Sequence, residues 1–257
     1  MDLGLRGKVA LVSGATSGLG LAVARGLAAE DVKVAVCGRR LEVAEAEAAT
    51  LTSAIGVQLD LIDPVSIRRV AEEVRTRLGQ IDILVVNGGG PPASTAIDFE
   101  AEKSRTAAEL LLNGPATLVS ECLSDMRDRG WGRVVAVGSS AIQQPIPRLT
   151  TSGMFRSALA SYLKLLSQEV ATDGVTINMV LPGRIDTPRV GQLDQGRATA
   201  QGRPIDAVRR ESEESIPVGR YGRPEEFAAL VVFLCGEPAS YITGEQLRVD
   251  GGMVRSF

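Results

Sequence analysis

The stretch VALVSGATSGLG, residues 9–20, decides which fold this chain is expected to adopt. Residues 9–12 form a continuous apolar run, as in a strand covered on both faces, and residues 19–30 carry apolar side chains at helical spacing. Glycines in the intervening turn let a pyrophosphate approach the helix N-terminus, where free N–H groups favour an anion. Such a turn between a first strand and a first helix predicts dinucleotide binding, with a merely structural tight turn as the alternative. The residues expected to contact the dinucleotide here are Gly14, Thr16, Ser17, Gly18, Leu19 and Gly20.

Strand-like and helical segments alternate along the rest of the chain. Further strands are expected at 32–37, 55–59, 81–87, 133–139, 175–181 and 245–252. Helices are expected at 41–53, 63–78, 99–129 and 152–171, and from about Pro224 onward. The alternation predicts an α/β fold: a single-domain, Rossmann-like, doubly wound parallel sheet of about seven strands with helices on both faces. We expect one domain over residues 1–257, with ligands bound at the carboxyl ends of the strands.

Composition argues against several other classes of protein. With 44% apolar residues, 23% charged residues and a net charge of −3, nothing points to nucleic acid or to an anionic membrane. The chain contains no histidine, which removes histidine metal sites and histidine general bases. Cys37, Cys122 and Cys235 lie far apart in apolar runs, and we expect buried thiols in a reducing compartment. Without an evident signal peptide or membrane span, the expectation is a cytoplasmic protein with no metal, nucleic-acid or membrane partner.

Further motifs make the chain resemble the short-chain dehydrogenase/reductase family over nearly its whole length. After the fourth expected strand, the residues Asn87-Gly88-Gly89-Gly90 are similar to the family's Asn-Asn-Ala-Gly turn, with departures at the second and third positions. Pro182-Gly183 followed by Asp186-Thr187 resembles the family's segment over the nicotinamide. Residues 216–228 and 241–252 resemble its C-terminal signature. The resemblance is strongest to 3-oxoacyl-[acyl-carrier-protein] reductase-like members, and it implies an oxidoreductase.

The residues after the second expected strand indicate which cofactor is preferred. The run Cys37-Gly38-Arg39-Arg40 lacks the acid that would hold a ribose 2′-hydroxyl, whereas Arg39 can pair with a 2′-phosphate. NADP(H) is therefore favoured over NAD(H), with a solvated basic turn at Arg39 and Arg40 as the alternative. The resemblance implies cofactor contacts at further positions, namely Asp60, Leu61, Asn87, Gly88, Gly89, Arg156, Pro182, Gly183, Ile185 and Thr187.

The resemblance also assigns catalytic positions, and there this sequence departs from the family. Ser139 matches the serine that hydrogen-bonds the substrate oxygen, and Asn113 matches the helix asparagine that supports a water-borne proton relay. The family's tyrosine and lysine fall at Ser152 and Arg156. A serine hydroxyl is a far weaker acid than a tyrosine hydroxyl, and an arginine keeps its charge but cannot relay a proton. Tyr162 with Lys164 does not restore the pair, because residues two apart point to different sides of a helix.

Two functions stay open from the sequence. In the first, the protein is an NADP(H)-dependent oxidoreductase for carbonyl or 3-oxoacyl reduction with an altered proton donor. Ser139 and Ser152 would orient the carbonyl, and Arg156 or a water would supply the electrostatics and the proton. In the second, it is a nucleotide-binding, non-catalytic homologue that acts as a sensor or as an inactive partner subunit. A purely structural role is disfavoured, because it would not require Arg39 or glycines at positions 14, 18 and 20.

Residues 188–215 occupy the position of the family's substrate lid. Its arginines could favour an acidic substrate or a carrier arm, and a solvated helix face is the simpler alternative. The expected partner is thus a small-molecule or carrier-bound carbonyl substrate. The resemblance implies a homotetramer built on the two long helices and the last strand. The leucines that could face partner subunits could equally form the core; they are Leu110, Leu111, Leu118, Leu159, Leu163 and Leu166.

Overall fold

A parallel β-sheet of seven strands organises the protein. The structure, a computed structural model, describes residues 1–256. The strand order is β3-β2-β1-β4-β5-β6-β7, and every neighbouring pair is parallel. The strands are β1 (Val9–Val12), β2 (Lys33–Gly38), β3 (Ala54–Gln58), β4 (Ile83–Val86), β5 (Gly132–Val137), β6 (Val175–Pro182) and β7 (Gln246–Val249). The chain winds outward in both directions from β1 and β4, which is the doubly wound arrangement expected from the sequence.

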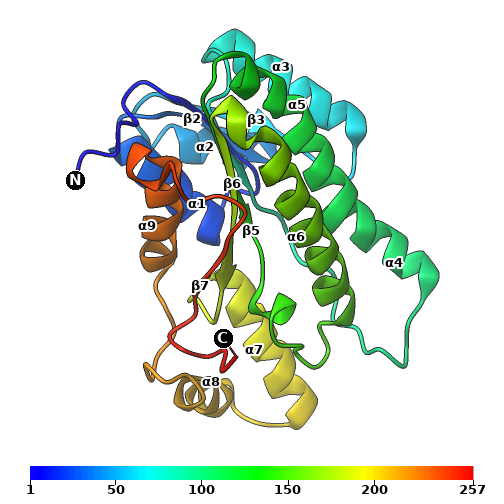
Figure 1. The fold of residues 1–257 in the computed structure, drawn as a ribbon. Coiled ribbons are helices and arrows are strands. Elements are labelled where there is room, and N and C mark those ends of the chain that lie inside the picture. The colour runs from blue at the N-terminus through cyan, green and yellow to red at the C-terminus, as the bar shows by residue number, and fades with distance from the viewer. Residues whose placement is uncertain (257) are drawn as a thin grey trace.

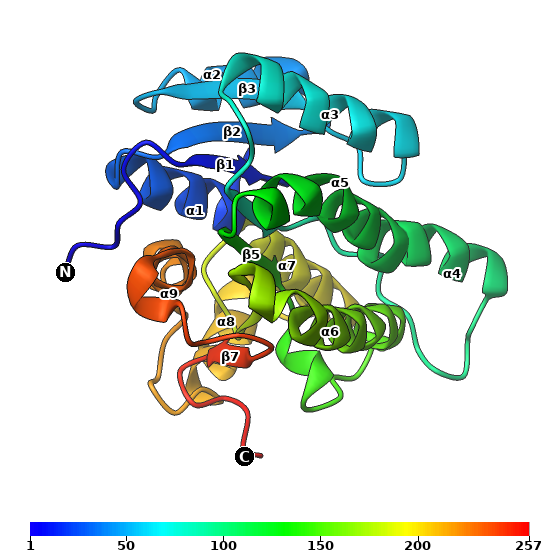
Figure 2. The same ribbon diagram turned by 45° about the horizontal axis from the view of Figure 1, so that its top comes forward.

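Helices cover both faces of this sheet (Figures 1 and 2). One face carries α1 (Gly18–Ala29), α2 (Leu41–Ala48) and α9 (Pro224–Cys235). The other face carries α3 (Pro64–Arg77), α5 (Gly114–Asp128) and α6 (Thr150–Val170). Within residues 1–256, no helix combines the length and the apolar composition needed to cross a bilayer.

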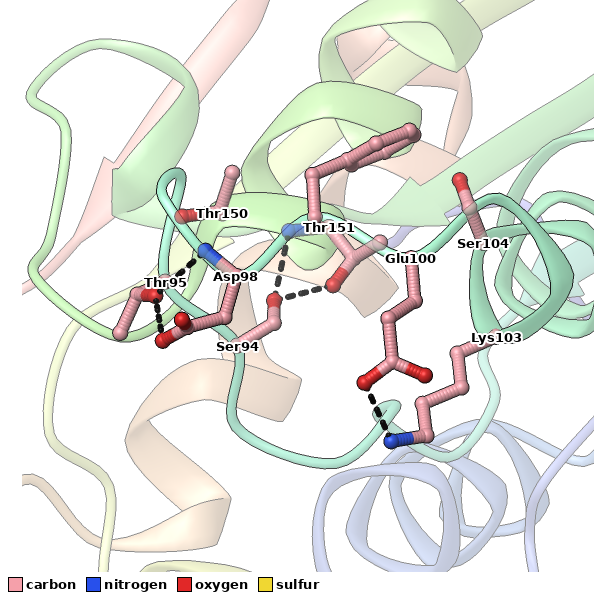
Figure 3. A pocket seen from close by; sticks show the side chains of 9 residues that line it. Ser94, Thr95, Asp98, Glu100, Lys103, Ser104, Thr150 and Thr151 are labelled. Atoms are coloured by element: carbon pink, nitrogen blue, oxygen red, sulfur yellow. Dashed lines mark hydrogen bonds and ion pairs between the residues drawn. The ribbon is translucent and has the colours of Figure 1, made fainter.

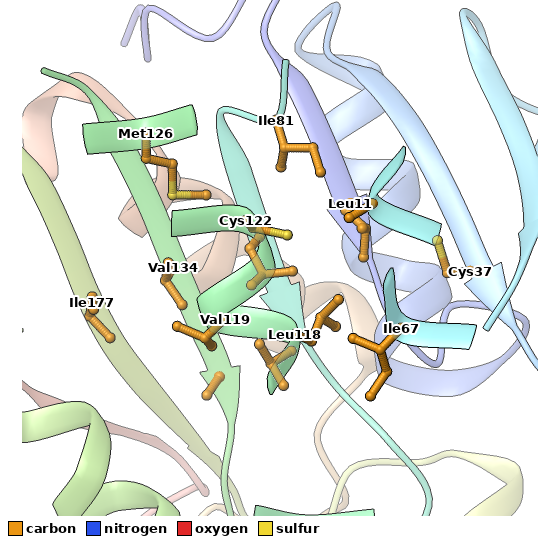
Figure 4. Packing of buried hydrophobic residues seen from close by; sticks show 14 of the residues in the cluster. Leu11, Cys37, Ile67, Ile81, Leu118, Val119, Cys122, Met126, Val134 and Ile177 are labelled. Atoms are coloured by element: carbon orange, nitrogen blue, oxygen red, sulfur yellow. The ribbon is translucent and has the colours of Figure 1, made fainter. Parts of the chain in front are cut away.

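Two apolar layers hold the helices on the sheet. Central strands are apolar on both faces, as β1, β4 and β5 show by being buried along their whole length. Figure 4 shows one of these layers, in which Leu11, Ile67, Leu118 and Val134 come together from two strands and two helices. The three cysteines are buried and unpaired, as expected, and burial raises the pKa of the Cys122 thiol to about 12. These thiols therefore behave as small apolar side chains.

The long helical region expected over residues 99–129 is interrupted. It consists of α4 (Ala101–Ala108), a π-helical turn (Glu109–Asn113) and α5. Pro115 has no N–H to donate within the helix, and the chain widens by one residue just before it. Gly114 also brings this turn so close to the loop after β3 that a Cβ would overlap the carbonyl oxygen of Leu61. The expected long helical region is therefore present, and the π-helical turn within it was not predicted.

Two other boundaries differ from expectation. The second helix ends at Ala48 rather than near residue 53, because the backbone turns at Ser53, where φ is 55°, to enter β3. Residues 188–215, for which no helix bounds were predicted, form α7 (Pro188–Gln201) and α8 (Ile205–Glu214). Figure 1 shows both helices below the sheet, where β6 ends. They cover the edge to which the carboxyl ends of the strands point.

Candidate active site

The glycine turn between β1 and α1 is closely packed and requires glycine. Gly14 has φ of 58°, and a Cβ there would lie 2.9 Å from the amide nitrogen of Asn87. A Cβ on Gly20 would overlap the carbonyl oxygen of Gly14. A side chain at either glycine would push the turn away from Asn87 or from itself, so glycine is what keeps the chain tight where it enters α1. Thr16 and Ser17 flank the turn, and Ser17, the N-cap residue of α1, does not use its hydroxyl to cap the helix.

Asn87 fastens the end of β4 to this turn. Its side-chain amide donates to the carbonyl of Gly14 over 2.9 Å, and its backbone N–H donates to the hydroxyl of Ser13 over 2.9 Å. The Ser13 hydroxyl in turn donates to the carbonyl of Asn87 over 2.7 Å. The sequence predicted that Asn87 lines the cofactor. The side chain is occupied in shaping the turn, so its role is to position the backbone.

The end of β2 presents two free cations. Arg39 and Arg40 are exposed, and neither forms an ion pair within the described residues 1–256. Gly38 lies against the glycine turn, since a Cβ there would come within 2.5 Å of the Thr16 side chain. Arg39 and Arg40 therefore follow directly after a residue that packs against the glycine turn.

The ends of β3 and β4 form the adjoining wall. Asp60 accepts from the backbone N–H of Ile62 over 3.2 Å through one carboxylate oxygen, which makes a tight turn. Leu61 is buried, and a Cβ on Gly88 would meet its side chain at 3.0 Å. Gly89 has open space around it. The structure thus brings Asp60, Leu61, Gly88 and Gly89 together at one edge of the sheet, and the cofactor contacts that the resemblance implies for them stay predictions.

The segment after β6 faces the glycine turn. Gly183 permits a close approach, because a Cβ there would lie 2.6 Å from the backbone of Asp250. Ile185 is buried and pairs with Gly222, which fixes the path of the chain after Pro182. The Thr187 hydroxyl accepts from the N–H of Val190 at 3.4 Å and so caps α7. A Cβ on Gly18 would meet the Thr187 side chain at 3.5 Å, so the start of α7 packs beside the glycine turn.

Two serine hydroxyls lie on the elements that would carry the reaction. Ser139 follows β5, and its hydroxyl accepts from the N–H of Ala141 over 3.2 Å. That bond leaves the hydroxyl proton of Ser139 available for donation. Ser152 lies in the first turn of α6, is half-buried, and makes no side-chain hydrogen bond within residues 1–256. No hydrogen bond in the described chain links the two hydroxyls.

Arg156 lies one turn after Ser152 on the same face of α6. Its Nη1 donates to the carbonyl of Val137, the last residue of β5, over 2.7 Å. Burial, and next the positive charge of Arg189, lower the pKa of Arg156 to about 10. The guanidinium therefore stays protonated at neutral pH, and its charge is held between α6 and the end of β5.

Asn113 sits at the end of the π-helical turn and is exposed. Its side-chain amide donates to the Glu109 carboxylate over 2.8 Å, and its carbonyl accepts from the Thr117 hydroxyl over 2.8 Å. No hydrogen bond of the described chain joins it to Ser139, Ser152 or Arg156. The structure therefore places Asn113 at the junction of the π-helical turn and α5, while its part in a proton relay stays a prediction.

The tyrosine and the lysine that α6 does contain, Tyr162 and Lys164, lie elsewhere, as expected. Tyr162 is half-buried against the apolar layer, and this burial, together with Glu169, raises the pKa of its hydroxyl. Lys164 donates to the carbonyl of Gly244 over 3.0 Å and pairs with Glu245 beside β7. Neither residue reaches the carboxyl ends of β4 and β5.

A small cavity, which the sequence did not reveal, adjoins the first turn of α6 (Figure 3). Its volume is about 40 Å³, enough for a solvent molecule but not for a nucleotide. The Ser94 hydroxyl accepts from the N–H of Thr151 over 3.1 Å and also contacts the Thr151 hydroxyl. Ser94 therefore anchors the start of α6 and helps to place Ser152. Its sequence surroundings gave no signal, because the partner lies far along the chain.

A buried carboxylate joins α7 to the segments that follow β6 and α8. Asp194 of α7 is 2% exposed; it accepts from the Tyr221 hydroxyl over 2.8 Å and from Arg184 over 2.6 Å. Nothing in the local sequence marks this carboxylate. Within residues 1–256, no group of three or more carboxylates, thiols or imidazoles is placed to hold a metal ion.

Comparison with known proteins assigns a family to this arrangement. Residues 14–254 match the family model described as Enoyl-(Acyl carrier protein) reductase, and this range contains every site segment described above. The chain belongs to the short-chain dehydrogenase/reductase family. The family and the α/β fold class predicted from the sequence are therefore confirmed.

Relatives of this short-chain dehydrogenase/reductase match it over nearly their whole length. It is 33% identical to the 3-oxoacyl-[acyl-carrier-protein] reductase of Aquifex aeolicus, over 98% of this chain and 100% of that protein. Among solved structures, L-sorbose reductase from Gluconobacter frateurii, complexed with NADPH and L-sorbose, has a TM-score of 0.95 and 31% identity over 100% of both chains. Actinorhodin polyketide ketoreductase with NADPH has a TM-score of 0.92 and 30% identity, covering 96% of this chain and 97% of that one.

Proposed function

We propose that this protein is an NADP(H)-dependent oxidoreductase that reduces a carbonyl group, of the 3-oxoacyl type or similar, with an altered proton donor. The observation that carries the proposal is the intact cradle: a side-chain-free glycine turn beside two unpaired arginines at the end of β2. The NADPH-containing structures of the sorbose and actinorhodin ketone reductases support it. So does the similarity to 3-oxoacyl-[acyl-carrier-protein] reductases.

The residues present fit an NADP(H) molecule. The glycine turn leads directly into α1, and the N–H groups at the N-terminus of that helix suit a pyrophosphate. Arg39, with Arg40 beside it, would hold the 2′-phosphate, because no acid stands there to prefer a free hydroxyl. Asp60, Leu61, Gly88 and Gly89 would hold the adenosine. The remaining contacts would come from Thr16, Ser17, Gly18, Leu19, Asn87, Arg156, Pro182, Gly183, Ile185 and Thr187.

NADPH, when bound, supplies the hydride, and the chain must orient the carbonyl and stabilise the developing negative charge. Ser139 donates a hydrogen bond to the carbonyl oxygen, because its own lone pair already accepts from Ala141. Ser152 donates a second hydrogen bond from the first turn of α6. Arg156 adds a fixed positive charge. Since neither serine is acidic at neutral pH, the proton comes through water, which the short Ser152 side chain leaves room to admit.

Without a tyrosine as proton donor, carbonyl reduction is expected to be slow. Losing a positioned general acid costs roughly 10²–10⁴ in rate, so we expect slow but measurable turnover. The test follows NADPH absorbance with a panel of 3-oxo thioesters and simple ketones, for the wild type and for Ser152→Ala. Oxidation that depends on the ketone supports the proposal. Binding of NADPH with no oxidation by any compound would instead favour the alternative, a nucleotide-binding homologue without turnover.

The proposal also covers the oligomeric state of the protein, its cellular location and the role of residues 188–215. We infer a cytoplasmic homotetramer, supported by the family resemblance alone. Most of the leucines considered for subunit contacts are used within the chain, since Leu111, Leu118, Leu159 and Leu163 are buried. Residues 188–215 act as a substrate lid within a single domain, supported by the position of α7 and α8 beyond β6.

A further inference from the structure

Two guanidinium groups without a carboxylate partner lie at the carboxyl edge of the sheet. Arg156 donates to the carbonyl of Val137 at the end of β5 over 2.7 Å. Arg189, in the first turn of α7, donates to the carbonyl of Pro91 after β4 over 3.1 Å. Since β4 and β5 are neighbours, both cations flank the place where the serine hydroxyls stand. Neither arginine forms an ion pair with any residue from 1 to 256.

Arg189 differs in this respect from most arginines of the lid. Arg197 and Arg203 both pair with Glu211, each at 2.6 Å. Arg209 pairs with Asp186 at 2.8 Å and with Glu213 at 3.1 Å. The basic character of residues 188–215 is thus largely neutralised inside the lid, which agrees with the simpler interpretation of its sequence. Arg189 instead reaches back across the crevice and lies against Gly90, where a Cβ would be 3.2 Å from its Nη2.

The environment of these two groups favours an added negative charge. Arg156 uses one N–H on Val137, and none of its other nitrogens is a buried atom lacking a partner, so they remain accessible to solvent. Burial first, and then the charge of Arg189, lower the pKa of Arg156, in keeping with the placement of both cations at the ends of neighbouring strands. Like charges held near one another are unfavourable, and an anion between them would offset the repulsion and satisfy the free donors.

We propose that Arg156 and Arg189 form an anion subsite that recognises a carboxylate on the carbonyl substrate, so that the preferred substrates are oxo acids. The inference rests on the proposed function, because it names the substrate class of the same site. A planar guanidinium matches a carboxylate with paired hydrogen bonds, which a lysine cannot provide. The short side chain of Ser152, one turn before Arg156 on α6, takes less room than the family's tyrosine would. The carbonyl then lies at Ser139 and Ser152 while the carboxylate lies at the arginines.

A phosphate of the cofactor is the other anion that this chemistry could serve. The start of α7, which carries Arg189, approaches the glycine turn, where the pyrophosphate is expected. Binding measurements distinguish a substrate carboxylate from a cofactor phosphate. If the arginines bind a cofactor phosphate, replacing them changes the affinity for NADPH itself. A substrate role changes only the preference for a carboxylate over its neutral ester.

The experiment measures binding by calorimetry with the protein saturated with NADP⁺, so that no turnover is needed. The probes are 3-oxohexanoate and its methyl ester, and NADPH is titrated separately. The variants are Arg189→Gln and Arg156→Lys. Arg210→Gln serves as the matched control, because Arg210 is an exposed residue of α8 that forms no ion pair within residues 1–256.

We expect the wild type and the control to bind the acid at least about tenfold more tightly than the ester, as for hydrogen bonds to a charged group. In Arg189→Gln this preference falls to about onefold while the Kd for NADPH stays the same. In Arg156→Lys, which keeps the charge and loses the planar fork, the preference is intermediate. Equal binding of acid and ester by the wild type, or no binding of either, overturns the subsite. So does a loss of NADPH affinity in Arg189→Gln with the preference unchanged. Failure of the proposed function is seen separately, as binding without NADPH oxidation.

Discussion

At the scale of single residues, the candidate site has two separate parts, the glycine turn after β1 and the first turns of α6. The glycines and Asn87 show directly why their residue types are needed, since a Cβ at Gly14 or Gly20 would collide with neighbouring backbone or with Asn87. Ser152 and Arg156 lie one turn apart on α6, and their roles in the reaction stay predictions. The cradle and the reaction site can therefore be tested by separate substitutions.

Arg39 is predicted to determine the preference for NADPH. Arg39→Ala removes a charge-assisted hydrogen bond to the 2′-phosphate, so the Kd for NADPH should rise roughly tenfold to a hundredfold. The Kd for NADH should change less than about threefold, because NADH lacks that phosphate. Calorimetry of both cofactors checks this, with Arg68→Ala on the solvent face of α3 as control. An equal loss of affinity for NADPH and NADH would show that Arg39 does not bind the 2′-phosphate.

Ser152 is predicted to orient the substrate without contributing to cofactor binding. Ser152→Ala should lower kcat/KM by about tenfold or more, as for loss of a hydrogen bond to a developing charge, with the Kd for NADPH unchanged. Ser152→Tyr should raise kcat by about tenfold or more, because it returns a phenolic proton donor beside a positive charge. Steady-state kinetics with one ketone measures both changes. An alanine variant with wild-type kcat/KM would remove Ser152 from the mechanism.

At the scale of elements, the sequence predicted most strands and helices because apolar runs and helical periodicity are local signals. It placed β1 correctly and bounded α3 well, since Asp63 and Pro64 are a local start signal that the structure uses. It missed the π-helical turn before Pro115, which depends on packing against Leu61 after β3. It also missed Ser94 and Asp194, whose partners lie far away in sequence.

The contact at the π-helical turn gives a stability prediction. Gly114→Ala places a Cβ against the Leu61 carbonyl, so the free energy of unfolding should fall by about 1–3 kcal/mol or more. Gly191→Ala is the matched control, because Gly191 is also helical and has open space around the position of a Cβ. That change should raise the free energy by up to about 1 kcal/mol, the usual gain of alanine over glycine in a helix. Urea unfolding of the two variants should therefore move in opposite directions.

The buried carboxylate of Asp194 gives a second prediction about stability. Asp194→Asn weakens the bonds from Arg184 and Tyr221, and we expect unfolding to become easier by about 1–3 kcal/mol. Asp206→Asn, at an exposed and unpaired position of α8, should cost less than about 1 kcal/mol. Hydrogen exchange should also speed up in α7 of the Asp194 variant. Unchanged protection of α7 would mean that Asp194 does not fasten the lid.

At the scale of the whole molecule, the doubly wound sheet brings residues distant in sequence to one edge. The ends of β1, β2, β4, β5 and β6 place the glycine turn, Arg39, Asn87, Ser139 and Thr187 around one crevice. This is why residues immediately after the expected strands were the informative ones in the sequence. Pairings across that edge, such as Arg189 with Pro91, depend on the folded lid and could not be predicted locally.

The most direct test of the account is calorimetric titration of the protein with NADPH, with NADH as the comparison. We predict a Kd in the micromolar range for NADPH and at least about tenfold weaker binding of NADH, because Arg39 and the glycine turn together recognise the phosphorylated cofactor. Absence of binding for both cofactors would contradict the account. It would mean that the cradle no longer holds a nucleotide.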